Sequence, residues 1–229
     1  MVIHSIAPTS YSGMYKIVPQ EGAAFFIRPE YLISLDFDSI QSEVEMDEDE
    51  TNELLDAGFT AVVELKAVDY LARAEQSRFG LTRKLLQKKY DKKYIDKALT
   101  FLESKNYLSD QRYAIAWLHT RRINHCEGRV KLIAELQNRG IDKETAQKAV
   151  NEFFEEYNEE EICLKACNKY IKKGKDGDKL ITSLLNAGFS YKMIKQVMEN
   201  NCIYKWKNRK ISKVIKIAGN GHKYPNHCD

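Results

Sequence analysis

The sequence has few of the residues that break a chain or cross-link it. It contains 4 prolines and 11 glycines in 229 residues. That is too few for the many tight turns of an all-β sandwich, so helices are favoured. The 5 cysteines are odd in number and widely scattered, unlike the disulfide framework of a small secreted domain. We therefore expect free thiols and a reducing environment.

Long apolar runs and nucleotide-binding loops are also missing. No run approaches the roughly 20 apolar residues that span a bilayer, and the start MVIHSIAPTSYSG lacks the basic flank and apolar centre of a secretory signal. Neither a Walker-type loop nor a Gly-x-Gly-x-x-Gly motif occurs. We expect a cytoplasmic protein that makes no membrane contact and needs no cofactor.

The net charge of +3 hides an uneven distribution. Residues 1–66 contain 3 Lys or Arg against 13 Asp or Glu, whereas the rest of the chain contains 33 against 20. An acidic front with a basic body is typical of proteins that contact nucleic acid, another polyanion or an acidic partner. Lysine-rich solvated helix faces are the alternative explanation.

The front segment predicts a small β-hairpin followed by an acidic helix. Short β-prone runs flank the polar PQEG, so we expect strands at Tyr15–Val18 and Ala23–Ile27 and a helical turn at Arg28–Ile33. The acidic run from Asp47 to Glu50 fits the first turn of a helix, where carboxylates complement the helix dipole. A calcium site is disfavoured because its alternating oxygen ligands and glycine are missing.

Three copies of one apolar pattern follow, each predicting three short helices. Leu85, Leu136 and Leu184 are equivalent, with periods of 51 and 48 residues. An apolar or aromatic residue follows five, ten and fourteen positions later in every copy. Units this small bury little alone, so we expect three tandem three-helix repeats stacked in an elongated, curved array, an essentially all-α fold.

The phrases QNRGI and NAGF predict how one helix stops and the next starts. Gly140 and Gly188 supply the left-handed residue that ends the second helix, and the next apolar residue packs beneath it. Lys89 takes the glycine position in the first repeat, where we expect a less favourable cap. The predicted segments are a hairpin and acidic helix at 1–60, repeats at 61–108, 109–157 and 158–200, and a basic tail at 201–229.

The second repeat carries a recognisable motif. Asp110–Ile141 reads DQRYAIAWLHTRRINHCEGRVKLIAELQNRGI and resembles the central motif of the RecX family. In order, the matching residues are Asp110, Tyr113, Ala114, Arg121, Arg122, Gly128, Leu136, Arg139, Gly140 and Ile141. The first repeat is similar to the family's opening helix pair and the third to its terminal Gly-Phe phrase. The resemblance covers about Tyr15 to Asn200.

This resemblance implies a regulator and not an enzyme. Members of the family bind the recombinase RecA, lie in the groove of the RecA–DNA filament and limit its growth and activity. For this chain it implies a monomer that binds RecA and the filament, and DNA weakly and in a salt-dependent way. It also implies restraint of ATP hydrolysis and strand exchange in recombination, DNA repair and the SOS response.

Basic residues near the helix ends of each repeat are the predicted contacts with the partner or with DNA. If the repeats stack, these ends form a basic stripe suited to phosphates or to an acidic protein surface. Arginines of the second repeat are favoured because their forked donors hold geometry better than lysine does. The predicted set is Arg73, Arg78, Arg83, Lys84, Arg121, Arg122, Arg129, Lys131, Arg139, Lys172 and Lys173.

Other readings remain open. A helical protein that binds DNA without RecA is the main alternative, because three-helix units with a basic edge also resemble helix-turn-helix modules. An enzyme is disfavoured, since His119 and His125 have no evident nucleophile and carboxylate partners.

Cys163 and Cys167 share a helix face and could supply half of a zinc site with His222, His227 and Cys228. Burial of two small side chains in a repeat interface explains the pair better. Trp206 in the basic tail suggests base stacking, and a disordered tail is equally compatible.

Overall fold

The computed structural model describes residues 1–201. Within them lie nine α-helices and one three-stranded antiparallel sheet, so the predicted, mostly helical fold is confirmed. The chain divides into two compact units. Unit 1 contains residues 1–117 and 136–149, and unit 2 contains residues 118–135 and the described chain from 150 onward. The division runs through the second repeat. The predicted elongated, curved stacking therefore stays a prediction, and the basic tail lies outside the described residues.

The N-terminal sheet has the order β1-β2-β3, with strands β1 (Ile3–Pro8), β2 (Tyr15–Pro19) and β3 (Phe25–Ile27). The predicted hairpin is β2 and β3, but the prediction of only two strands was wrong. In β1 only the first residue, Ile3, is fully buried, so the segment lacks the alternation that marks a half-buried strand. Two strands alone are only marginally stable in water, so the pairing of β1 with β2 stabilises the hairpin.

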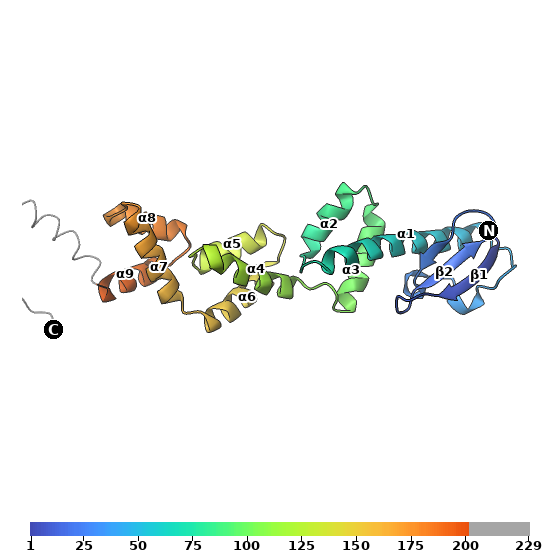
Figure 1. The fold of residues 1–229 in the computed structure, drawn as a ribbon, viewed down its shortest axis with the longest axis horizontal. Helices are drawn as coiled ribbons and strands as arrows, with labels where there is room; N and C mark the ends of the chain where they lie inside the picture. Colours follow the sequence, from blue (N-terminus) through green and yellow to red (C-terminus); the bar gives the residue numbers. More distant parts are fainter. Residues whose placement is uncertain (202–229) are drawn as a thin grey trace, which may run out of the picture. The chain divides into compact units, whose positions relative to one another are not determined.

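Helix α1 (Glu48–Leu71) joins the sheet to the first repeat (Figure 1). Its N-cap is Asp47, whose carboxylate accepts from the Glu50 N–H at 2.8 Å while the Glu50 carboxylate accepts from the Asp47 N–H at 3.0 Å. This capping box confirms the predicted role of the acidic run. The prediction of a separate acidic helix ending near residue 60 was wrong, because the residues around Ala61 are buried and continue the helix without a breaker.

A buried ion pair holds the sheet against α1. Both nitrogens of the Arg28 fork donate to the Glu64 carboxylate, at 2.9 and 2.6 Å, and the Tyr31 hydroxyl donates to the same group at 2.8 Å. The guanidinium of Arg28 also lies 4.4 Å from the ring centre of Phe101. Burial of a charge is tolerated here because the carboxylate is both paired and hydrogen-bonded.

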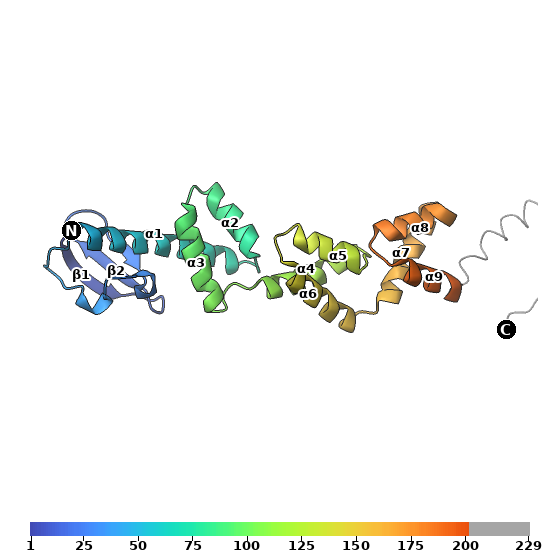
Figure 2. The ribbon, with the colours of Figure 1, turned by 180° about the vertical axis from the view of Figure 1, so that it is seen from behind.

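The remaining helices fall into the three predicted repeats. Helices α2 (Arg78–Gln87) and α3 (Lys92–Ser104) complete the first with the end of α1. The second is α4 (Asp110–Asn124), α5 (Arg129–Gln137) and α6 (Lys143–Glu156). The third is α7 (Glu159–Lys172), α8 (Gly177–Asn186) and α9 (Tyr191–Asn200), which Figure 2 shows from behind. The equivalent leucines 85, 136 and 184 are all fully buried.

The predicted helix-stop device is present in all three repeats. The N–H groups of Tyr90, Ile141 and Phe189 donate back to the carbonyls of the equivalent leucines at 3.2 to 3.3 Å. The residue before each has a positive φ, 64° at Lys89, 81° at Gly140 and 90° at Gly188. This is the Schellman arrangement. Lys89 pays a steric cost that glycine avoids, of roughly 1 kcal/mol.

The turns at Gly140 and Gly188 each pack against the start of the second helix of the preceding repeat. In unit 1 the Ser77 hydroxyl donates to the Arg139 carbonyl at 3.1 Å, and a Cβ on Gly140 would lie 2.2 Å from the Cβ of Phe79. In unit 2 the Gly128 N–H donates to the Ala187 carbonyl at 2.8 Å, and a Cβ on Gly188 would lie 2.5 Å from that of Lys131. Glycine is therefore required for close approach as well as for its backbone conformation.

Candidate functional site

The predicted basic residues of unit 1 differ in how firmly they are held. Arg73 lies exposed just after α1, and Arg83 is exposed on α2 with its guanidinium 5.8 Å from the Phe79 ring. Lys84 is half-buried and donates to the Gln76 side chain at 2.7 Å, with its Nζ 5.2 Å from the Tyr70 ring. Arg73 and Arg83 are thus the members of this group that face solvent.

Arg78 is a structural residue as much as a surface one. Its backbone N–H donates to the Asp110 carboxylate at 2.7 Å. Its guanidinium pairs with Glu103 and donates to the Thr100 hydroxyl at 3.2 Å. Burial raises the pKa of Asp110 even though the Arg78 N–H favours the charged form. One side chain therefore links the start of α2 to α3, and its backbone reaches the start of α4.

Arg121 and Lys131 share one buried glutamate. Arg121 donates to both carboxylate oxygens of Glu127, at 2.8 and 3.0 Å, and the Lys131 ammonium lies 2.8 Å from the same carboxylate. Burial alone would raise the pKa of Glu127, but the hydrogen bonds from the two cations outweigh it and lower that pKa to about 2. The cluster closes the loop between α4 and α5, so both cations position backbone in the free protein.

Arg129 is held in the same way by other partners. It donates to Glu159 at 2.7 Å and to the Asn151 side chain at 2.7 Å, with its guanidinium 4.5 Å from the Phe154 ring centre. The neighbouring Arg122 is exposed, and its guanidinium lies 4.0 Å from the ring centre of Tyr157. Arg129 therefore ties α5 to α6 and α7, whereas Arg122 presents its charge at the surface.

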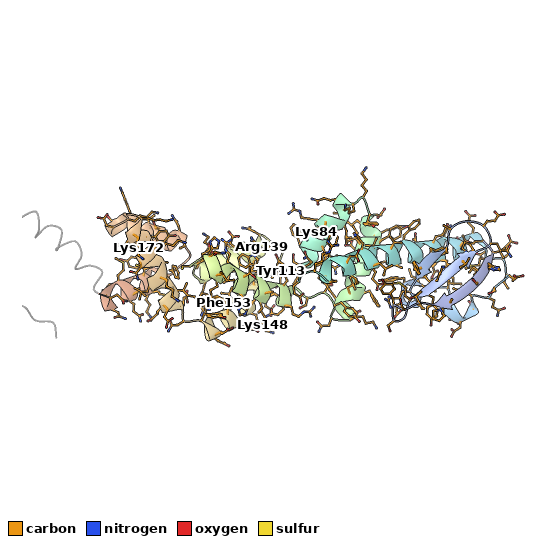
Figure 3. All side chains as sticks on the ribbon, viewed as in Figure 1. Lys84, Tyr113, Arg139, Lys148, Phe153 and Lys172 are labelled. Atoms are coloured by element: carbon orange, nitrogen blue, oxygen red, sulfur yellow. The ribbon has the colours of Figure 1, made fainter. Side chains whose placement is uncertain are left out.

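Arg139 and the α7 lysines complete the predicted set. The half-buried Arg139, labelled in Figure 3, lies two residues after the end of α5. Its guanidinium is 4.4 Å from the centre of the Trp117 ring. Lys172 and Lys173 are exposed at the end of α7. The structure brings Arg121 and Lys131 onto one shared partner, the Glu127 carboxylate. A single basic stripe running through both units stays a prediction.

Sequence reasoning missed the acidic partners of these arginines and two further lysines. Glu127 follows Arg121 by six residues and Glu159 follows Arg129 by thirty, separations that no helical spacing rule detects. Lys165 and Lys169 were detectable, because they precede Lys173 by eight and four residues and so share its helix face. All of these lysines are exposed.

The histidine and cysteine candidates lie in packed surroundings. The His119 ring contacts those of Phe153 and Tyr157 edge-on, at 6.1 and 5.7 Å, and its Nδ1 is 3.3 Å from the Tyr157 hydroxyl. Cys163 and Cys167 are buried, and burial raises the pKa of the Cys163 thiol to about 12. Such a thiol is a poor nucleophile or metal ligand at neutral pH. The part of the chain that the structure describes contains no group of three metal-binding side chains. His222, His227 and Cys228 lie outside the described residues.

In residues 1–201 no helix is long and apolar enough to cross a membrane. Fold and surface together define a protein of tandem three-helix repeats. It presents basic side chains, some anchored by carboxylates and some open to solvent.

Comparison with known proteins extends this description. The model of the second three-helix domain of RecX matches residues 109–150, and that of the first matches residues 65–102. Regulatory protein RecX of Treponema pallidum (strain Nichols) is 31% identical over 135 residues, covering 59% of this chain and 82% of that protein. Regulatory protein RecX of Clostridioides difficile (strain 630) is 29% identical over 160 residues, covering 67% and 74%.

A solved structure shares the fold as well. The crystal structure of a regulatory protein RecX aligns with a TM-score of 0.68 at 20% identity, covering 86% of this chain and 98% of that one. This chain belongs to the RecX family, whose curated members matched here are named regulatory proteins.

Proposed function

We propose that this protein binds RecA and the RecA–DNA filament and restrains filament extension, ATP hydrolysis and strand exchange. It would act as a cytoplasmic monomer in recombination, DNA repair and the SOS response, by binding and without catalysis. Membership of the RecX family is the observation that carries the proposal, because this chain matches both three-helix domain models of RecX and its relatives are named regulatory protein RecX. The repeats supply the rigid scaffold on which a binding surface is best held.

The predicted basic residues take two roles in this proposal. Arg73, Arg83 and Arg122 are exposed and present charge to the filament, as do Lys172 and Lys173. The remaining members are half-buried against their protein partners and act as positioning residues that keep the loops and helix ends in place. They are Arg78, Lys84, Arg121, Arg129, Lys131 and Arg139.

The test measures DNA-dependent ATP hydrolysis by RecA, and filament length by electron microscopy, with increasing amounts of this protein. We expect progressive inhibition and shorter filaments. The variant Arg73→Ala, Arg83→Ala, Arg122→Ala should inhibit at least 10-fold less well at equal concentration. A control that also removes three exposed positive charges, Lys92→Ala, Lys143→Ala, Lys148→Ala, should inhibit like the unmodified protein. No effect of the unmodified protein on either measurement would refute the proposal.

A second function, DNA binding without RecA, is favoured by one observation. Helix α7 and its C-cap carry four exposed lysines, at 165, 169, 172 and 173, that form no ion pair among the described residues. Tight, salt-sensitive binding to bare duplex that added RecA leaves unchanged, together with no inhibition of RecA, would favour this function over the first.

A further inference from the structure

One face of α7 is built almost entirely from lysine. Lys165, Lys169, Lys172 and Lys173 follow at spacings of four, three and one residue, and Asn168 lies among them. These five residues line a shallow hollow of about 490 Å³. The adjoining strip of α7, with Ile162, Cys163, Ala166 and Cys167, is buried in unit 2. The five hollow-lining residues are called the α7 lysine face.

The lysines of this face form no ion pair within the described residues, although Glu161 lies four residues before Lys165 on the same helix and Glu127 lines one pocket with Lys169. By contrast, Lys66, Lys92 and Lys195 each pair with an acid three or four residues away on their own helix. Lys169 and Lys172 lie in the last turn of α7, where the negative end of the helix dipole stabilises a positive charge. Lys165 lies one turn earlier, too far from the helix end for the dipole to stabilise its charge in the same way. Four positive charges are therefore concentrated on one short segment without a partner in the described chain.

The composition of this face distinguishes between two kinds of partner. Protein interfaces are depleted in lysine at their centre and contain aromatic and apolar anchors. The α7 lysine face has no such anchor, since its lining is four lysines and an asparagine. Flexible ammonium groups suit phosphates, which are recognised as charge and not through a fixed bidentate geometry. A nucleic-acid backbone fits better than an acidic protein surface.

The length of the face also suits a backbone. Residues 165 to 173 span about 12 Å at 1.5 Å per residue, and a duplex carries about seven negative charges over that length. We infer that the α7 lysine face binds the phosphate backbone of DNA directly, independently of base sequence. The inference deepens the proposed function, on which it rests, by assigning this part of the surface to the DNA of the RecA–DNA filament.

The test uses the full chain, a fluorescent duplex of about 30 base pairs and no RecA, with binding followed by anisotropy across a salt series. The test variant is Lys165→Gln, Lys169→Gln, Lys172→Gln, Lys173→Gln. The control, Lys92→Gln, Lys97→Gln, Lys192→Gln, Lys195→Gln, removes the same number of exposed lysines elsewhere. A third variant replaces the four α7 lysines with arginine. Circular dichroism checks that all of them fold.

The test variant should bind the duplex about 10- to 100-fold more weakly near 0.1 M salt. The slope of log K against log salt should become shallower by up to about 3.6, because each of the four lost phosphate contacts removes about 0.9. The control and the arginine variant should keep the slope of the unmodified protein to within about 1.

Three results would overturn the inference: an unmodified protein that does not bind duplex, a test variant with an unchanged slope, or an equal loss in the control. The first two would leave the α7 lysine face without a role in binding DNA. If the test variant binds bare duplex normally but inhibits RecA less, the face contacts protein, and the inference is wrong. RecA inhibition by the unmodified protein is scored separately, so failure of the proposed function is seen independently of duplex binding.

Discussion

The arginines around α5 and the lysines of α7 belong to the same unit and carry the same charge, but their surroundings differ. Arg121 and Arg129 each meet a glutamate at 2.7 to 2.8 Å, and the Glu127 side chain is only 6% exposed. On the α7 lysine face, residues 165, 169, 172 and 173 have no such partner in the described chain and are exposed. The first group holds helices together, and the second leaves its charge open.

This difference shows why a count of basic residues does not locate a binding surface. A guanidinium already bonded to a buried carboxylate contributes to the fold, and its positive potential is largely cancelled at close range. An unpaired lysine face adds little to stability and retains its potential. Anchored and open groups should therefore respond to substitution in opposite ways, with stability lost in one and binding lost in the other.

The largest loss of stability is expected at Gly188, where the turn of the third repeat packs against Lys131 at the start of α5. Gly188→Ala adds a Cβ 2.5 Å from both the backbone nitrogen and the Cβ of Lys131, at a φ of 90°. Overpacking and the left-handed backbone together should lower the free energy of unfolding by about 3 kcal/mol or more, as measured by urea unfolding. Displacing Lys131 also disturbs its contact with Glu127.

Gly174→Ala is the matched control for this change. Gly174 has a similar φ of 79°, but nothing lies within 4 Å of its added Cβ. Only the backbone cost of about 1 to 2 kcal/mol should appear. Equal losses in the two variants would mean that the close approach at Gly188 contributes nothing.

The next effect tests the shared glutamate itself. Glu127→Gln keeps the shape of the side chain but removes the charge that Arg121 and Lys131 face. Both cations are partly exposed and can be hydrated, so we expect a loss of about 2 kcal/mol, less than a fully buried pair would give. Urea unfolding measures it, with the exposed Glu161→Gln as a control that should change stability by less than about 0.5 kcal/mol. A loss as small as that of the control would show that Arg121 is not anchored.

A third prediction uses pH to titrate the same carboxylate. The pKa of Glu127 is about 2 in the folded protein, below its ordinary value of 4.5. A lowered folded pKa means that the stabilisation is fully present above about pH 4.5 and is lost as the pH falls toward 2. Between these limits the unmodified protein should lose about 2 kcal/mol more stability than Glu127→Gln, which has no carboxyl group to titrate there. Parallel stability–pH curves for the two proteins would contradict this.

The repeats were predictable from sequence because their determinants are local. Leu136, Gly140 and Ile141 lie within six residues, and the bond that closes the turn joins the first to the last. The same pattern recurs at Leu184 and Leu85, so apolar spacing and a glycine were enough to place the helix end. The capping box at Asp47 was predictable for the same reason.

What sequence reasoning missed depends on distant partners. Strand β1 exists because it pairs with β2, and its own residues carry little β pattern. The anchoring of Arg129 depends on Glu159, thirty residues away, which only the folded chain brings within 2.7 Å of it. About half of the basic residues predicted to contact a partner therefore make their main contacts inside the protein.

The smallest expected effect concerns stability on the α7 lysine face. Lys169→Gln with Lys172→Gln should change the free energy of unfolding by less than about 0.5 kcal/mol, because both side chains are exposed and neither forms an ion pair within the described residues. The small loss of stability should come from removing two positive charges at the negative end of the α7 dipole. Urea unfolding at low and high salt measures it, since a dipole effect is screened by salt. A loss above about 1 kcal/mol would show that these lysines also hold the fold, and the distinction between anchored and open charges would no longer apply to this helix.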